Sequence, residues 1–270
     1  MAIKKWIAIS LKVVEPTPLV AEAADVLSSL KDDVVVIGAA ALQIVLADPR
    51  AGSSDAAVAS TRDVDLVVVT PTRDVDLVIE AGTASHVIDE LEAAGLKRSE
   101  EAHERPFTWV RDDLKVQLLR PFHPFPGADA ASLPSNSALS LVSKDEHRMG
   151  VAFADEPSEI RLTAVTSAAL IALKHAAFGR QRHDGEPVER DYHDVALIAL
   201  YRADDLEHAY NTALYEVRSR VDRALALLSA GGKETQAAAR QHVAINGGSA
   251  RDRANEIARA ATFLARRLTP

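Results

Sequence analysis

Thr61-Arg-Asp-Val-Asp-Leu-Val-Val68 is followed three residues later by a near copy, Thr72-Arg-Asp-Val-Asp-Leu-Val-Ile79. Each copy alternates polar and apolar residues and then becomes wholly apolar, which predicts a strand that enters a core. Residues two apart in a strand project from the same face. Asp63 and Asp65 therefore share one face of the first copy, and the aspartates of the second copy do the same.

The sequence around this repeat predicts a mixed sheet with helices. Val34 to Ile37 is a continuous apolar run typical of a buried strand, and Gly38 separates it from a helical stretch that runs to Ala47. The other elements expected in this half are a helix over 16–30, a helix over 84–94, and strands over 107–111 and 114–119.

After Arg161 the pattern is almost entirely helical. Helices are expected over 167–178, 190–201, 206–229, 234–245 and 250–268. We therefore predict an α+β protein with a mixed sheet flanked by helices in residues 1–155, followed by a helical domain in residues 156–270.

Composition limits the class of protein. Hydrophobic residues make up 47% and charged residues 26%, as in soluble globular proteins. Cysteine is absent, which excludes disulfides and Cys-ligated zinc or iron–sulfur sites. No apolar run approaches the roughly 18 residues of a membrane span, so we expect a cytoplasmic protein with no membrane partner.

The formal charge of −8 is unevenly distributed. Residues 1–160 hold 15 basic and 26 acidic residues, and residues 161–270 hold 16 and 13. The basic C-terminal half suggests a nucleic-acid or protein partner, although arginines on solvated helices would give the same count. The arginines concerned are Arg218, Arg220, Arg223, Arg251, Arg253, Arg259, Arg266 and Arg267.

Two features of the N-terminal half suit phosphate chemistry. Mg²⁺ prefers oxygen ligands and is often held by one or two carboxylates plus substrate phosphates, which Asp63 and Asp65 could supply. Gly38 and Ala39 lie at a strand–glycine–helix junction, where free N–H groups and the helix dipole attract phosphate. Each pattern alone is also typical of ordinary structure: a solvated strand edge in the first case, a packing glycine in the second.

Two further features lie in the helical half. Lys174 is the cation of an otherwise apolar helical segment, so it either extends to water or meets an anion. Arg190-Asp191-Tyr-His-Asp194 opens the next predicted helix, and its two aspartates share one helical face. Acidic residues in a first turn are also ordinary surface residues favoured by the helix dipole.

The order of these four elements resembles the nucleotidyltransferase superfamily of DNA polymerase beta type, and more narrowly the AbiEii-type toxins and their mycobacterial relatives. Residues 37–42 resemble the family's apolar–glycine start, and residues 61–66 resemble its Thr-X-Asp-apolar-Asp-apolar core. Lys174 and Arg190-Asp191-X-X-Asp194 resemble its later motifs. The resemblance covers about residues 34–200.

This resemblance implies a Mg²⁺-dependent transfer of a nucleotide from a nucleoside triphosphate to an acceptor. It implies Asp63 and Asp65 as metal ligands, Lys174 on the triphosphate and Asp191 in a supporting acidic role. Gly38, Ala39, Arg190 and Asp194 would complete the nucleotide site. Some members modify the 3′ end of tRNA as toxins and are neutralised by an antitoxin, so RNA and an antitoxin are the partners implied.

Three departures from the family pattern keep alternatives open. Ala39 stands where serine or a second glycine is usual, and Gln117 occupies the position of a third carboxylate. The repeat leaves two candidate metal pairs: Asp63 and Asp65 lie nearer the glycine junction, whereas the second pair leads more directly into the following helix. A non-catalytic nucleotide-binding protein and an enzyme acting on a small molecule, as aminoglycoside nucleotidyltransferases do, are the alternative functions.

Other enzyme classes lack a sequence anchor. The nine histidines are scattered without metal-ligand spacing. Neither a Gly-X-Ser-X-Gly elbow nor a Walker loop is present.

Overall fold

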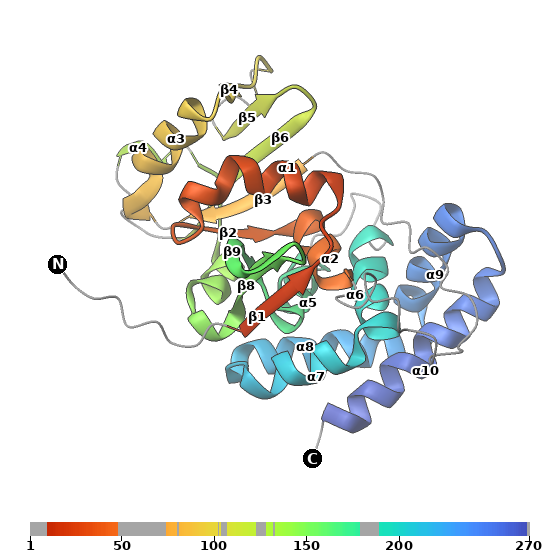
Figure 1. The fold of residues 1–270 in the computed structure, drawn as a ribbon. Helices are drawn as coiled ribbons and strands as arrows, with labels where there is room; N and C mark the ends of the chain where they lie inside the picture. Colours follow the sequence, from red (N-terminus) through yellow and green to blue (C-terminus); the bar gives the residue numbers. More distant parts are fainter. Residues whose placement is uncertain are drawn as a thin grey trace. The chain divides into compact units, whose positions relative to one another are not determined.

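The computed structural model describes residues 10–47, 74–79, 81–101, 103, 107–122, 128–131, 133–178 and 189–268. The described residues fall into two compact units, of which the first contains those up to Thr166 and the second those from Ser167 onward. Figure 1 shows that the first unit holds the strands and that the second is helical. The predicted α+β class and the helical C-terminal region are confirmed.

The first unit is built on a mixed sheet whose strand order is β1-β8-β9-β2-β3-β6-β5-β4, with β7 paired to β6. Strand β3 lies between β2, to which it is antiparallel, and β6, to which it is parallel. The strands are β1 (Ser10–Val14), β2 (Val34–Ile37), β3 (Asp74–Ile79), β4 (Lys97–Arg98), β5 (Thr108–Arg111), β6 (Leu114–Pro121), β7 (Ser135–Asn136), β8 (Arg148–Phe153) and β9 (Glu156–Val165).

Side-chain alternation explains how the central strands are buried. All four residues of β2 are buried, as expected for an apolar strand covered on both faces. Strand β6 alternates strictly between buried and half-buried residues, so Val116 and Leu118 face the core while Lys115 and Gln117 project from the other face. The predicted strands over 34–37, 107–111 and 114–119 are confirmed within a few residues.

The helices of the first unit follow the predicted apolar spacing. They are α1 (Pro18–Leu27) with the 3₁₀ turn η1 (Ser28–Leu30), α2 (Gly38–Leu46), η2 (Ala81–Thr83), α3 (Ala84–Ala93), α4 (Ala128–Ala131), η3 (Ser137–Ser143) and η4 (Asp145–His147). Helix α1 begins at a Thr17 cap, whose hydroxyl accepts from the N–H of Val20, and has proline in its first turn. Helix α2 contacts β2, β3 and β9.

The second unit consists of helices in its described part. They are α5 (Ser167–Phe178), α6 (Glu189–Tyr201), α7 (Ala203–Thr212), α8 (Tyr215–Ser229), α9 (Lys233–Asn246) and α10 (Ala250–Leu268). Helix α6 packs on α5, α9 and α10, and α8 packs on α5 and α10. The predicted helices over 167–178, 190–201, 234–245 and 250–268 are confirmed.

The structure differs from the sequence prediction at two places. The single helix expected over 206–229 is two helices, because Ala213 and Leu214 adopt extended backbone angles between α7 and α8. Strand β9, which extends to Val165, was not predicted, whereas α5 begins at Ser167 as expected. Strand β9 therefore lies beyond the boundary drawn at residues 155 and 156, and it belongs to the first unit.

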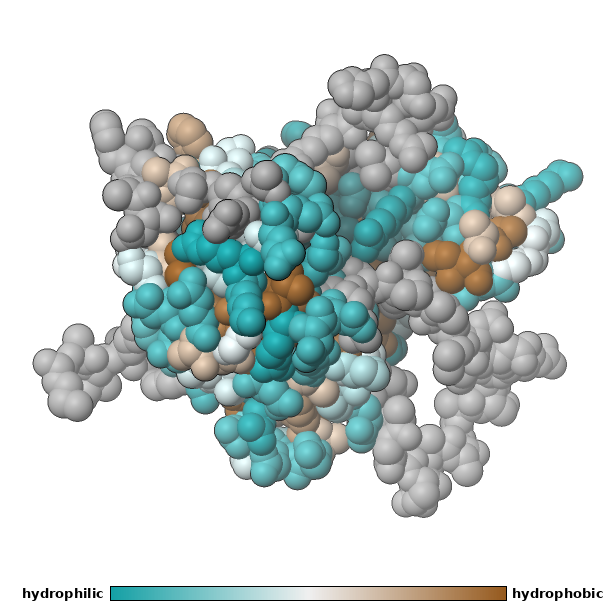
Figure 2. Space-filling model, turned by 90° about the horizontal axis from the view of Figure 1, so that it is seen from above, coloured by the Kyte–Doolittle hydropathy of each residue, from teal (hydrophilic) through white to brown (hydrophobic). Residues whose placement is uncertain are grey.

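Apolar side chains are scattered on the surface. Among the described residues, no helix combines the length and the apolar character needed to cross a bilayer. Hydrophilic residues dominate the face seen in Figure 2, with small and separate hydrophobic areas. The large apolar side chains that are exposed are Leu11, Phe122, Leu214, Tyr215 and Phe263.

Candidate functional site

The two aspartate pairs have different standing in the structure. Asp63 and Asp65 lie outside the described residues, so their assignment as metal ligands stays a prediction. Asp74 and Asp76 begin β3, where Asp74 is exposed and Asp76 is half-buried. They project from the face opposite to Val75, which is fully buried. The second copy of the repeat is thus a strand with both carboxylates on one side.

Pairing places Asp76 in the middle of a row of residues on neighbouring strands. Asp76 is the partner of Ile37 in β2 and of Gln117 in β6. Gln117 is in turn the partner of Thr108 in β5. Paired residues project from the same face, so the glutamine found at the expected third-carboxylate position lies beside Asp76.

Gly38 brings the backbone against Asp76. Its φ of +66° is a left-handed conformation that favours glycine, and a Cβ at this position would collide with Oδ2 of Asp76. Gly38 also begins α2, whose N-terminus has no side-chain cap. The first-turn N–H groups, which include that of Ala39, have no partner within the helix. The aspartate therefore lies close to a helix N-terminus.

In the second unit, Lys174 of α5 is held by two carboxylates of α6. Its Nζ lies 3.0 Å from Oδ1 of Asp191 and 2.5 Å from Oδ2 of Asp194. The side chains are 13% exposed for Lys174, 18% for Asp191 and 5% for Asp194. Asp191 and Asp194 therefore share one helical face, as their spacing of three residues predicts, and both contact the lysine.

Electrostatics keep this lysine charged. Burial lowers the pKa of Lys174, but the charges of Asp194 and Asp191 outweigh burial, so the pKa is raised above its ordinary value. Burial raises the pKa of Asp194, while Lys174 and Arg190 oppose that shift. Arg190 itself is exposed in the first turn of α6. The group therefore contains the acids Asp191 and Asp194 and the cation Lys174, and Arg190 adds a second positive charge near Asp194.

Two residues on the sheet face that carries Asp74 and Asp76 were not predicted from the sequence: Lys115 and Thr108. Lys115 pairs with Asp74 in the register of β3 and β6, which puts a cation beside the first aspartate. Thr108 is fully buried, and its Oγ1 has no hydrogen-bond partner among the residues that the structure describes. The alternation of β6 could have pointed to Lys115, because it predicts that residues 115 and 117 share a face. No local signal identifies Thr108, because its neighbours depend on strand pairing.

A second buried cluster begins at His193, the residue before Asp194 in α6. Nε2 of His193 in α6 lies 3.3 Å from Nδ1 of His242 in α9, and both residues are almost fully buried. Arg253 of α10 donates to the Tyr201 hydroxyl at 3.4 Å. Burial, followed by the charges of His242 and Arg253, lowers the pKa of His193 to about 4. His193 is therefore neutral in the folded protein near pH 7.

Ion pairs neutralise part of the C-terminal arginine charge. Arg253 pairs with Glu256 at 2.9 Å, and Arg267 pairs with Asp204 at 2.9 Å and with Glu207. These pairs are at least partly exposed, so each contributes little to stability. They also reduce the positive charge that these helices present to a polyanion.

The residues of the sheet face suit a hard divalent cation. Among the described residues, no three His, Cys, Asp or Glu side chains gather as a metal-holding group. Asp74 and Asp76 nevertheless form a same-face carboxylate pair, and the missing Cβ of Gly38 leaves Oδ2 of Asp76 its space. Two carboxylates supplemented by phosphate oxygens are a usual donor set for Mg²⁺. The residues therefore fit the ion that the sequence predicts.

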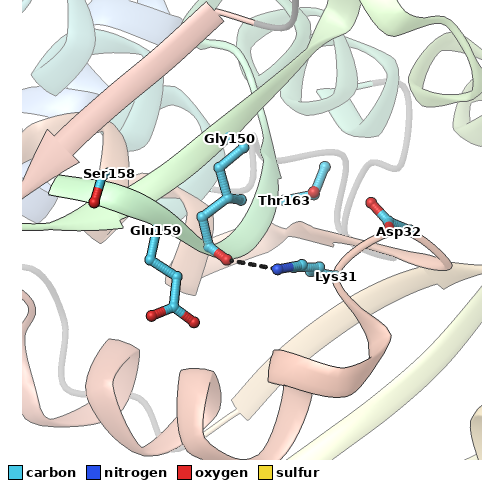
Figure 3. A pocket seen from close by; sticks show the side chains of 7 residues that line it. Lys31, Asp32, Gly150, Ser158, Glu159 and Thr163 are labelled. Carbon is cyan, nitrogen blue, oxygen red and sulfur yellow. Dashed lines mark hydrogen bonds between the residues drawn. The ribbon is translucent and has the colours of Figure 1, made fainter. Parts of the chain in front are cut away.

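A separate pocket lies at the other end of β2, with a volume of about 210 Å³. Figure 3 shows Lys31 directed at the carbonyl oxygen of Ile160, to which its Nζ donates at 3.3 Å. Asp32 and Glu159 also line the pocket. The pocket is open and is lined by one cation and two acids, so its charge favours neither an anionic nor a cationic ligand. None of the predicted site residues lines this pocket.

No protein-family model, no curated protein and no solved structure matches this chain.

Proposed function

We propose that this protein is a Mg²⁺-dependent nucleotidyltransferase in which Asp74 and Asp76 hold the metal ion. The observation that carries the proposal is the position of Asp76, which lies against the left-handed Gly38 and beside Gln117 in β6. A same-face carboxylate pair next to the N-terminus of α2, whose N-cap residue Ile37 makes no side-chain cap bond, offers negative oxygens for metal and N–H donors for phosphate. Bound Mg²⁺ would neutralise charge on the phosphates.

Lys174 is proposed to bind the triphosphate. An ammonium group has three N–H donors, and Asp191 and Asp194 occupy two of them. Within the described part of the chain this leaves one donor for a phosphate oxygen, and the raised pKa keeps the group charged over the physiological range. Asp194, with a side chain only 5% exposed, acts by positioning the lysine rather than by touching the nucleotide. Asp191 is proposed as the supporting acid.

The acceptor implied by the resemblance is RNA, with the 3′ end of tRNA as the specific hypothesis and an antitoxin as the protein partner. The test is incubation with each labelled nucleoside triphosphate, Mg²⁺ and total RNA, with Asp76→Asn as the blank. Labelled RNA supports this proposal. A labelled small molecule instead of RNA supports nucleotidyl transfer and overturns the RNA acceptor.

One observation favours a second candidate, a non-catalytic nucleotide-binding protein. Gln117 pairs with Asp76 where a third carboxylate would act as general base, and an amide cannot accept that proton. Nucleotide affinity measured by calorimetry, together with no transfer of label to RNA or to small molecules, would support this candidate and contradict the enzyme.

A further inference from the structure

Gln117 and Thr108 form an unexplained polar pair beside the proposed metal ligands. They are partners in the register of β5 and β6, and Gln117 is also the partner of Asp76 in β3. In the antiparallel pair of β5 and β6, directly opposed residues have Cβ atoms about 4.5–5.5 Å apart, and neighbouring strands such as β3 and β6 lie about 4.7–4.9 Å apart. A glutamine amide at this position can therefore reach the aspartate on one side and the threonine on the other.

Thr108 has an unsatisfied hydrogen-bonding group. It is 0% exposed, and in the described ranges its Oγ1 meets no hydrogen-bond partner. Buried hydroxyls without a partner are uncommon because burial removes them from water without compensation. We expect the Thr108 hydroxyl to form a hydrogen bond in the conformation in which the protein works. Gln117 is the polar residue paired with Thr108.

The two ends of an amide differ in chemistry. The NH₂ end donates and the oxygen end accepts or coordinates. If the NH₂ of Gln117 donates to Oγ1 of Thr108, its oxygen points back along the row towards Asp76. Amide oxygens are ligands of hard divalent cations, as carboxylates are. The same rotation would satisfy the threonine and complete an oxygen donor set.

We propose that Gln117 supplies a neutral third oxygen ligand to the divalent cation held by Asp74 and Asp76, and that Thr108 orients it. This inference rests on the proposed function of the aspartate pair. It assigns a metal-binding role to the residue that would otherwise count against that site. It also gives a donor set with two negative charges instead of three, next to the cation of Lys115.

The test measures binding of Mn²⁺ alone, in the absence of nucleotide, by electron paramagnetic resonance of the free ion. Mn²⁺ accepts the same oxygen ligands as Mg²⁺. Gln117→Met keeps the side-chain length without the amide, and we expect it to weaken Mn²⁺ binding about tenfold, the scale of losing one supporting group. Gln117→Glu adds a charged oxygen and is expected to tighten Mn²⁺ binding, because an anionic oxygen attracts the cation more strongly than a neutral one.

Thr108→Val separates orientation from ligation. Valine has nearly the shape of threonine but no hydroxyl, so we expect weaker Mn²⁺ binding, by a few-fold, and no loss of thermal stability in the metal-free protein. Thr163→Val, at a buried threonine of β9, is the matched control and is expected to leave Mn²⁺ binding unchanged. A Thr108→Val protein that binds Mn²⁺ as the wild type does would overturn the orienting role.

The outcomes distinguish this inference from the function on which it rests. Wild-type affinity in Gln117→Met, with affinity lost in Asp76→Asn, overturns the glutamine ligand and leaves the aspartate site standing. Equal affinity in the wild type and Asp76→Asn overturns both. Circular dichroism of each variant establishes that the compared proteins are folded.

Discussion

The two units hold their charged groups in different ways. In the first unit the backbone does so: strand pairing sets Asp76 beside Gln117, and the left-handed Gly38 leaves space for the carboxylate. In the second unit, side chains hold one another, with Lys174 between Asp191 and Asp194. We call Asp76, Gln117 and Gly38 the sheet group, and Lys174, Asp191 and Asp194 the helical group. The sheet group should respond most to changes of shape, and the helical group to changes of charge.

Removal of the lysine should break the helical group most strongly. Lys174→Ala leaves Asp194 buried without its cation, and loss of one partner of a buried ion pair costs about 3 kcal/mol. We expect that fall in the free energy of unfolding, measured by urea denaturation, together with weaker triphosphate binding by calorimetry. Lys233→Ala, at an exposed lysine of α9, is the control. Unchanged nucleotide affinity in Lys174→Ala would remove the lysine from the site.

Acid should weaken the helical unit through His193. Its pKa is about 4 in the folded protein, against about 6.5 in an unfolded chain. Below pH 6.5 the unfolded chain binds a proton that the folded protein does not, so stability present at neutral pH falls as pH drops from 6.5 towards 4. The full loss is about 3 kcal/mol.

The measurement is urea denaturation of the wild type and His193→Gln across this pH range. The variant lacks the titrating group, so its stability should vary less with pH. Parallel curves for the two proteins would show that His193 is not the group responsible.

The sheet group should be most sensitive at one glycine. Gly38→Ala forces a side chain into a left-handed conformation, which costs about 1–2 kcal/mol, and also displaces the Asp76 carboxylate. Gly95→Ala is the matched control: Gly95 has φ of +88°, but its added Cβ would meet nothing closer than Arg111 Cδ at 4.0 Å. Both should lower the melting temperature, and only Gly38→Ala should lower Mn²⁺ affinity. Equal Mn²⁺ affinities would separate Gly38 from the metal site.

Local sequence signals predicted the elements that position both groups. The apolar run of β2, the glycine after it and the aspartate spacing of β3 are short-range patterns, and the structure has them as expected. The shared face of Asp191 and Asp194 also follows from helical spacing alone. Their joint contact with Lys174 required the packing of α5 on α6, which no spacing within one helix encodes.

The missed elements depend on distant pairing or on weak local signals. The first part of β9, Glu156 to Glu159, is exposed and polar, so it lacks the apolar alternation that identifies a strand. The break between α7 and α8 contains neither glycine nor proline. The extended backbone at Leu214, which ends one helix before the next begins, therefore could not be predicted from the local sequence. Thr108 could be linked to the aspartate pair only through its register with Gln117.

Label transfer in two aspartate variants shows which copy of the repeat holds the metal ion. Asp76→Asn and Asp65→Asn make the same chemical change in the two copies of the repeat, and each would be incubated with labelled triphosphate, Mg²⁺ and RNA. We expect background transfer in Asp76→Asn and clear transfer in Asp65→Asn, with both proteins folded. Wild-type transfer in Asp76→Asn would rule out Asp74 and Asp76 as the metal pair.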